Sequence, residues 1–150
     1  MLGQHGIKDE INKLIRFYFD SKEHFRLAAK RATGEQQAEL TALCEDREAF
    51  HIQLQELVTR MNVEMSDNGS VGADLKRDWE RLRGAFGGEG LQSALKLAQE
   101  SETSAIAQAD RILQAGVPDQ LNRLIQSHVT KMRATQDRLG PMLDAQTQPA

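Results

Sequence analysis

The sequence predicts an all-α fold, an up-down four-helix bundle made of two antiparallel hairpins joined by a long crossover. Three observations predict it. Apolar residues recur at steps of three and four over four long segments, which is the period of a buried helix face. Glycine, proline and turn-forming residues divide these segments by two short connections and one long one. Only 3 Pro and 5% aromatic residues favour helices over a sheet fold.

The first hairpin is expected on either side of Gly34. Its first helix covers about residues 7–32, with an apolar stripe at Ile7, Ile11, Leu14, Tyr18, Phe25 and Ala29. Its second helix covers about residues 35–62, with a stripe at Leu40, Leu43, Phe50, Leu54, Leu57, Val58 and Met61. Gly34 can adopt the left-handed conformation that commonly ends a helix. The short connection predicts an antiparallel pair.

The second hairpin is expected around Gly116-Val117-Pro118. Its helices cover about residues 89–115 and 119–139. Pro118 is compatible with the first turn of the last helix. Gly140-Pro141 is predicted to end that helix, and the tail 140–150 is expected to be disordered. The sequence thus predicts one domain over residues 1–139.

A long central segment, residues 63–88, has to join the two hairpins. It begins with the turn formers of residues 66–70 and contains an expected short helix over about residues 73–86, which carries Trp79. We interpret Trp79 as the side chain that packs this helix onto the bundle. Because both neighbouring connections are short, the segment must travel along the bundle. Two hairpins joined by one such crossover is a recognised bundle connectivity.

Composition excludes several classes of protein. A chain of 150 residues is the usual size of one domain, and its formal net charge of −3 without a basic run argues against nucleic-acid binding. No run of about 20 apolar residues and no signal-peptide pattern is visible, so no membrane partner is expected. The single cysteine, Cys44, fits a reducing compartment and is interpreted as a small core residue. A cytoplasmic protein is expected.

Four polar residues fall on or between the apolar stripes near the middle of the helices. At about 100° per residue, Lys22, Arg47, Glu102 and His128 point inward, one from each helix. We predict a buried polar layer in which Arg47 and Glu102 form a charge-assisted ion pair, with Lys22 and His128 attached to it. A guanidinium cannot lose its proton to become a metal ligand, so no metal and no cofactor is favoured in this layer.

An alternative is a reduced metal site that holds one Fe, Mn or Zn ion. Its ligands would be Glu48, His51, Glu102 and His128. Di-metal bundles place a Glu-x-x-His motif on two helices and a glutamate on the other two. Here Glu48-Ala49-Phe50-His51 is one match, but the residue three before His128 is Ile125, so the second motif is missing. One match in a charged helix is expected by chance.

A further alternative is a small-anion or ligand pocket around Lys22 and Arg47. Elsewhere on the first helix, Asp20 and Glu23 are predicted to point away from the stripe. Phe17 and Phe19 also point away from it, and two outward aromatic residues indicate an interface, so a homo-oligomer, preferably a dimer, is expected.

Taken together, the chain resembles the ferritin-like superfamily, which includes bacterioferritins and rubrerythrins. It is most similar to an uncharacterised proteobacterial subgroup of ferritin-like bundles. The resemblance covers roughly residues 7–139 and is carried by Asp20, Arg47, Phe50, Leu54, Gly69-Ser70, Gly72, Arg77-Asp78-Trp79, Glu102 and Gln136-Asp137-Arg138. Relatives have glycine and an acidic residue where this chain has Ser21 and Lys22, and histidine where it has Gln136.

These departures remove possible ligands, so the resemblance implies a ferritin-like fold with a degenerate di-iron site. The expected function is therefore that of a non-enzymatic bundle that acts through protein contacts, with a stress-related role as one expectation. A metal-binding ferritin-like oxidoreductase is the alternative.

Overall fold

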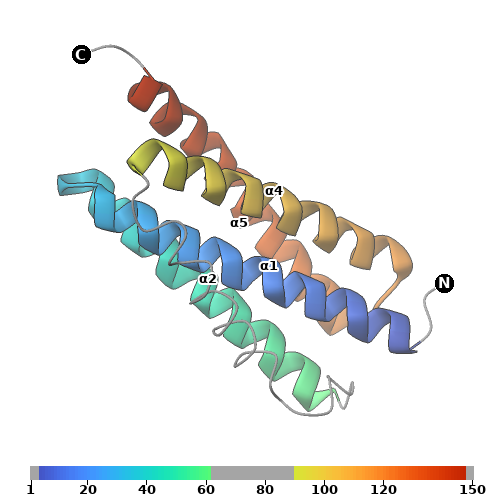
Figure 1. Ribbon diagram of the computed structural model, residues 1–150. Helices are drawn as coiled ribbons and strands as arrows, with labels where there is room; N and C mark the ends of the chain where they lie inside the picture. The colour runs from blue at the N-terminus through green and yellow to red at the C-terminus, as the bar shows by residue number, and fades with distance from the viewer. Residues whose placement is uncertain (1–3, 62–89, 148–150) are drawn as a thin grey trace.

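The computed structural model describes residues 4–61 and 90–147, which form four α-helices (Figure 1). Helix α1 spans Gln4–Arg31, α2 spans Gly34–Arg60, α4 spans Leu91–Ala115 and α5 spans Asp119–Thr147. The predicted all-α bundle is thus confirmed, and the first three predicted segments begin and end close to the observed helices. The crossover and the short helix expected over residues 73–86 lie outside the described residues.

In cross-section the four helices lie at the corners of a square, and each helix contacts two neighbours. Helix α1 packs closely against both α2 and α4, and α4 packs against α5, whereas α2 and α5 have the loosest contact of the four neighbouring pairs. Figure 1 shows that α1 and α5 run in one direction and that α2 and α4 run in the opposite direction. Every neighbouring pair is therefore antiparallel, and the two short connections predict this for α1–α2 and for α4–α5.

Two apolar clusters fill the interior, one toward each end of the bundle. The first is made by the N-terminal halves of α1 and α5 and the C-terminal halves of α2 and α4. It includes Tyr18 and Phe50, whose ring centroids lie 5.5 Å apart. The second cluster is smaller and includes Phe25, Leu40, Leu95 and Leu139. Burial of these apolar side chains is the main force that stabilises the bundle.

The two clusters are separated by a set of buried polar residues, one from each helix. We call Ser21, Arg47, Glu102 and Thr135 the central polar layer. Each lies between members of the two clusters on its own helix, and none is more than 3% exposed.

Helix α1 is more deeply buried near its middle than its sequence pattern predicts. Phe19 is buried and Phe17 packs against the first cluster, so the interpretation of both as outward-facing interface residues is wrong. Glu23 is buried and Asp20 is half-buried, which corrects the prediction that both point away from the core. Ile52 is the exposed large hydrophobic residue of the described chain. Among residues 4–61 and 90–145, no exposed aromatic patch supports an oligomer.

The last helix does not end at Gly140-Pro141, as predicted, but continues to Thr147 with Pro141 inside it. Pro141 cannot donate its backbone nitrogen to the helix, and this loss usually ends one. The lost hydrogen bond is offset by apolar packing, since Met142 and Leu143 lie against the second apolar cluster. Residues 140–147 thus belong to the bundle and are not part of a disordered tail.

Replacing Gly140 by alanine is expected to raise the free energy of unfolding by about 1 kcal/mol, because glycine is a poor helix former. A Cβ atom added there would meet no atom within 4 Å. Gly116 provides the matched control. It has the same free space but a φ of 87°, so alanine there should cost about 1 kcal/mol. Urea unfolding of both variants measures the difference. A loss of stability at Gly140 would show that α5 ends before this residue.

Within the described residues, no helix combines the length and the apolar character needed to cross a membrane.

Candidate functional site

Arg47 and Glu102 form a buried ion pair at the centre of the bundle. Both side chains are 0% exposed. The Nε atom of Arg47 lies 3.0 Å from each carboxylate oxygen of Glu102, and its Nη2 atom also donates to Glu102 Oε1. Nη2 donates a further hydrogen bond to Thr135 Oγ1, at 2.8 Å. The contact joins α2, α4 and α5, and it is the pair that the sequence predicts.

Aromatic rings enclose the guanidinium on the apolar side. Its central carbon lies 4.6 Å from the centroid of the Phe50 ring and 5.6 Å from that of Phe25. The ring faces attract the cation and shield it from water. Thr135 in turn donates its hydroxyl to the Lys131 carbonyl oxygen, at 2.9 Å. Both carboxylate oxygens of Glu102 therefore accept hydrogen bonds from Arg47.

The other two residues of the predicted layer are buried but lie apart from this pair. Lys22 is beside the layer, because Ser21 occupies the core position between Tyr18 and Phe25 on α1. Its Nζ atom lies 3.8 Å from Glu23 Oε1 and 4.3 Å above the Phe19 ring. The prediction that Lys22 attaches to the ion pair is thus corrected.

His128 is two helical turns from Thr135, the residue by which α5 enters the central polar layer. The prediction that His128 joins the Arg47 pair is therefore also corrected. The relative shift of α4 and α5 places Thr135 level with Glu102, and a hydrogen bond of 2.7 Å between Gln136 and Thr103 reports the same alignment. The pattern on α5 could not distinguish the two residues, because both lie on its apolar stripe.

His128 belongs instead to a second network, in which the buried Tyr18 and His128 side chains meet Gln53, an exposed residue of α2. The Tyr18 hydroxyl lies 2.9 Å from His128 Nδ1, and His128 Nε2 lies 2.9 Å from Gln53 Oε1. An amide oxygen only accepts, so Nε2 carries the proton and Nδ1 accepts from the tyrosine. The imidazole is stacked on Phe50, with centroids 4.0 Å apart. The network links α1, α5 and α2.

Burial determines the protonation state of this network. It lowers the pKa of His128 to about 3, and the nearby Lys131 and Arg47 cations lower it further. Burial also raises the pKa of the Tyr18 hydroxyl far above its ordinary value, a shift that Arg47 opposes and Glu102 reinforces. Both groups are therefore neutral at neutral pH, and the tyrosine remains a hydrogen-bond donor.

A third buried contact joins α1 to α4 through His24 and Ser101. The Ser101 hydroxyl donates to the Leu97 carbonyl oxygen at 3.0 Å, so His24 Nδ1 donates its proton to Ser101 Oγ. Burial lowers the pKa of His24 to about 4. On the same helix, burial raises the pKa of the half-buried Asp20 to about 6, and Arg16 opposes this shift. The sequence analysis missed His24 and Ser101, because neither belongs to a predicted apolar stripe, and it placed Asp20 on the outside of the helix.

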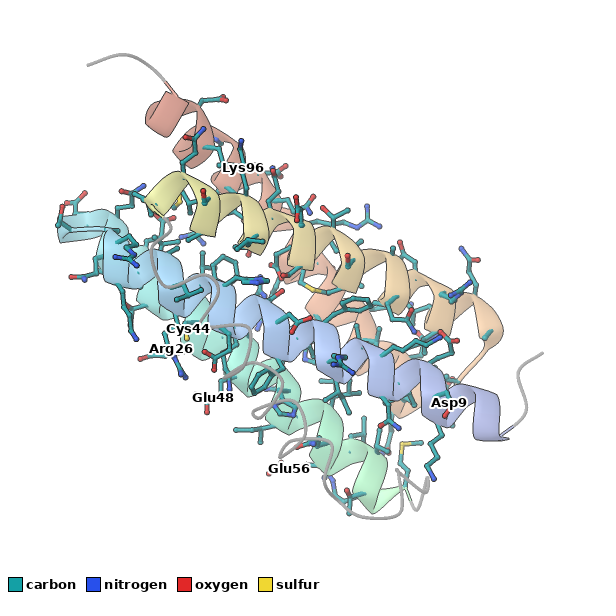
Figure 2. The ribbon with its side chains drawn as sticks, viewed as in Figure 1. Asp9, Arg26, Cys44, Glu48, Glu56 and Lys96 are labelled. Carbon is teal, nitrogen blue, oxygen red and sulfur yellow. The ribbon has the colours of Figure 1, made fainter. Side chains whose placement is uncertain are left out.

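Charged and polar side chains line the outer side of the α1–α2 pair. Figure 2 labels Arg26, Cys44 and Glu48 there, with Lys96 on α4 at the other side of the bundle. Cys44 is half-buried, and burial raises the pKa of its thiol, so it is not an activated nucleophile. Glu48 is exposed. His51 is half-buried against Phe19, and its Nε2 atom has no hydrogen-bond partner among the described residues.

The residues that the structure describes do not form a metal centre. In the described ranges 4–61 and 90–147, no group of three or more His, Cys, Asp or Glu side chains is placed to hold a metal ion. The alternative ligand set is not brought together. Glu102 is held by Arg47, His128 has both ring nitrogens in hydrogen bonds, and Glu48 points to solvent. The Arg47 guanidinium, which cannot bind a metal ion, lies where a metal ion bound to Glu102 would have to lie.

An open groove of about 500 Å³ lies between α2 and α5, the two helices with the loosest contact. It is lined by Gln53, Glu56, Leu57, Arg60, Gln120, Arg123 and Leu124. Glu56 is labelled on α2 in Figure 2. Gln53 connects the groove to the buried network, because it accepts the hydrogen bond from His128. The sequence pattern did not reveal the groove, which depends on how the two helices separate.

Comparison with known proteins gives a family but no activity. Neither the curated proteins nor the solved structures contain a match. A family model described as a domain of unknown function, DUF2383, matches residues 7–115, which comprise most of α1 and all of α2 and α4. Arg47 and Glu102 lie within the matched range, whereas Thr135 and His128 lie beyond it. Since the match covers more than half of the chain, the protein belongs to the DUF2383 family.

Proposed function

We propose that this protein is a ferritin-like bundle in which an ion pair stands in place of a di-metal centre, and that it acts in the cytoplasm through protein contacts rather than by catalysis. The observation that carries the proposal is the Arg47–Glu102 pair, which is 0% exposed. A carboxylate held by a guanidinium is already neutralised. It offers a metal ion no free charge and no free lone pair in the direction of the pair.

The helix directions support the ferritin-like assignment. Helices α2 and α4 run in the same direction, so the end of α2 and the start of α4 lie at opposite ends of the bundle (Figure 1). A chain that joins two such ends has to pass along the bundle, and two hairpins with one long crossover is the ferritin-like connectivity. We assign the short helix over residues 73–86 to this crossover.

The α2–α5 groove is the surface that we propose for a partner. Leu57 and Leu124 provide an apolar floor, and Arg60 and Arg123 stand on its two sides. Glu56 is the single carboxylate among the residues that line the groove, so two positive charges stand against one negative charge. A segment of a partner protein with an apolar side chain flanked by carboxylates would complement this arrangement, because apolar contact provides affinity and opposite charge provides orientation.

The proposal can be tested by photo-crosslinking in cells of the source organism. With p-benzoylphenylalanine at the position of Gln120, on the rim of the groove, we expect a discrete covalent adduct. Arg60→Glu combined with Arg123→Glu should abolish it, because the groove then repels an acidic partner. The matched control Lys96→Glu changes an exposed charge on α4 and should leave the adduct unchanged. An adduct of twice the mass of the chain would identify the partner as a second copy, the expected homo-oligomer.

Metal analysis of the same protein tests the other half of the proposal. After purification without chelator and exposure to Fe(II), Mn(II) and Zn(II), we expect no stoichiometric bound metal. Near-stoichiometric metal that is lost in Glu102→Ala or His51→Ala would overturn the proposal in favour of a metal-binding oxidoreductase. An adduct that persists in the double glutamate variant would instead reject the groove as the contact surface.

A further inference from the structure

Two buried polar atoms in the central polar layer have no hydrogen-bond partner among the described residues. They are Arg47 Nη1 and Ser21 Oγ, and both residues are 0% exposed. Arg47 uses Nε and Nη2 for Glu102 and Thr135, so Nη1 is the unused end of the guanidinium. Buried donors are almost always paired, either with protein or with ordered water. A group that completes this layer is therefore expected.

The neighbouring rings place the two atoms at the same height in the bundle. On α1, Ser21 lies between Tyr18 and Phe25, one turn from each. The Arg47 guanidinium lies 5.6 Å from the Phe25 ring and 4.6 Å from the Phe50 ring, and the Phe50 ring lies 5.5 Å from that of Tyr18. Along the bundle axis, the guanidinium thus lies between Tyr18 and Phe25, the two residues that flank Ser21 on α1.

Charge restricts what can bind there. Arg47 and Glu102 neutralise each other, so an added anion would be buried beside a carboxylate without a cation of its own. The ligand must instead be neutral and accept a hydrogen bond from Nη1. It must also be small, because the layer lies between the two apolar clusters and none of its four residues is more than 3% exposed. On α4 the neighbours of Glu102 one turn away are the small side chains of Ala98 and Ala105.

We propose that the central polar layer contains a binding site for one internal water molecule, which accepts from Arg47 Nη1 and donates to Ser21 Oγ. Water has the required size, neutrality and donor–acceptor balance, and buried waters typically bridge polar groups that the protein leaves unpaired. The water connects α1 to the ion pair, so that all four helices take part in one polar network.

The test is oxygen-17 magnetic relaxation dispersion, which counts water molecules that exchange slowly with solvent. Ser21→Val removes the hydroxyl and fills its space, so the count should fall by one relative to the unchanged protein. Ser127→Val is the matched control, because Ser127 is exposed on α5, and it should leave the count unchanged. An equal count in the unchanged protein and Ser21→Val would overturn the proposal.

A high-resolution crystal structure of the unchanged protein decides the question even if Ser21→Val does not fold. Density for one water within hydrogen-bond distance of both atoms is the expected result. A direct hydrogen bond between Ser21 Oγ and Arg47 Nη1, without water between them, would reject the site.

Discussion

Replacing Arg47 by methionine is expected to lower the free energy of unfolding by about 3–5 kcal/mol, because the change leaves the Glu102 carboxylate buried without its counter-ion. Both side chains are 0% exposed, so water cannot compensate for the loss. Glu102→Met should cost a similar amount, since the guanidinium then keeps only Thr135 and the aromatic rings. The double variant should recover most of the loss, because two apolar side chains fill the space without burying a charge.

Denaturant unfolding of the two single variants and the double variant measures these differences and gives the coupling energy of the pair. The exposed ion pair between Arg138 on α5 and Glu39 on α2 provides a matched control. Because its side chains are 50% and 33% exposed, Arg138→Met should cost less than about 1 kcal/mol. Similar losses in Arg47→Met and Arg138→Met would mean that burial does not determine the strength of the central pair.

The double variant also tests what the pair contributes to the alignment of the helices. A buried ion pair adds little net stability over an apolar substitute, so we attribute its presence to the specification of helix register. The NMR spectrum of Arg47→Met with Glu102→Met should then show several slowly exchanging conformations. A single set of sharp resonances from a stable protein would remove this role.

Acidification is expected to destabilise the bundle by about 1–2 kcal/mol per pH unit between about pH 6 and pH 4.5. Burial lowers the pKa of His24 to about 4 and that of His128 to about 3, against 6.5 in an unfolded chain. Over this range the unfolded chain binds these protons and the folded chain does not. Their stabilising contribution is therefore complete above about pH 6.5 and is lost as the pH falls toward the folded values. Burial also lowers the pKa of His51, so this residue adds to the loss of stability in acid.

Asp20 opposes this trend. Burial raises the pKa of its carboxyl to about 6, so the folded protein takes up a proton there that the unfolded chain does not. That uptake favours the folded state as the pH falls. Two histidines act against one aspartate, and the net effect is a loss of stability in acid.

Denaturant midpoints measured across this pH range, with three variants, separate the contributions. His128→Gln keeps an amide that can serve Tyr18 and Gln53 but cannot titrate, so the pH dependence should become flatter. His24→Asn, which retains a donor for Ser101, should act in the same direction. Asp20→Asn should make the dependence steeper, because it removes the opposing proton. A flatter dependence in Asp20→Asn would contradict the assigned sign.

Much of the fold follows from local information in the chain. A helix that buries one face must repeat apolar residues every three or four positions, so the stripes of α1, α2, α4 and the first part of α5 could be read directly. The same reasoning placed Arg47 and Glu102 inside, because each lies near the centre of its stripe. An inward guanidinium and an inward carboxylate at similar heights predict a pair, and the structure contains it.

The continuation of α5 past Pro141 could not be predicted in this way. Local propensity argues for an end at Gly140-Pro141, and only the packing of Met142 and Leu143 against the second cluster outweighs it. The groove between α2 and α5 is also a property of the assembly, because no single helix encodes its distance from a neighbour.

The sequence by itself thus determined the helices, their buried faces and the ion pair, because these depend on the periodicity of one helix at a time. Only the tertiary structure decided which residues complete the central polar layer. Ser21 and Lys22 both fit between Tyr18 and Phe25, and Thr135 and His128 share one stripe on α5. The choice within each pair depends on the rotation of α1 about its axis and on the shift of α5 along α4. Both are set by contacts among all four helices, which a one-dimensional pattern does not contain.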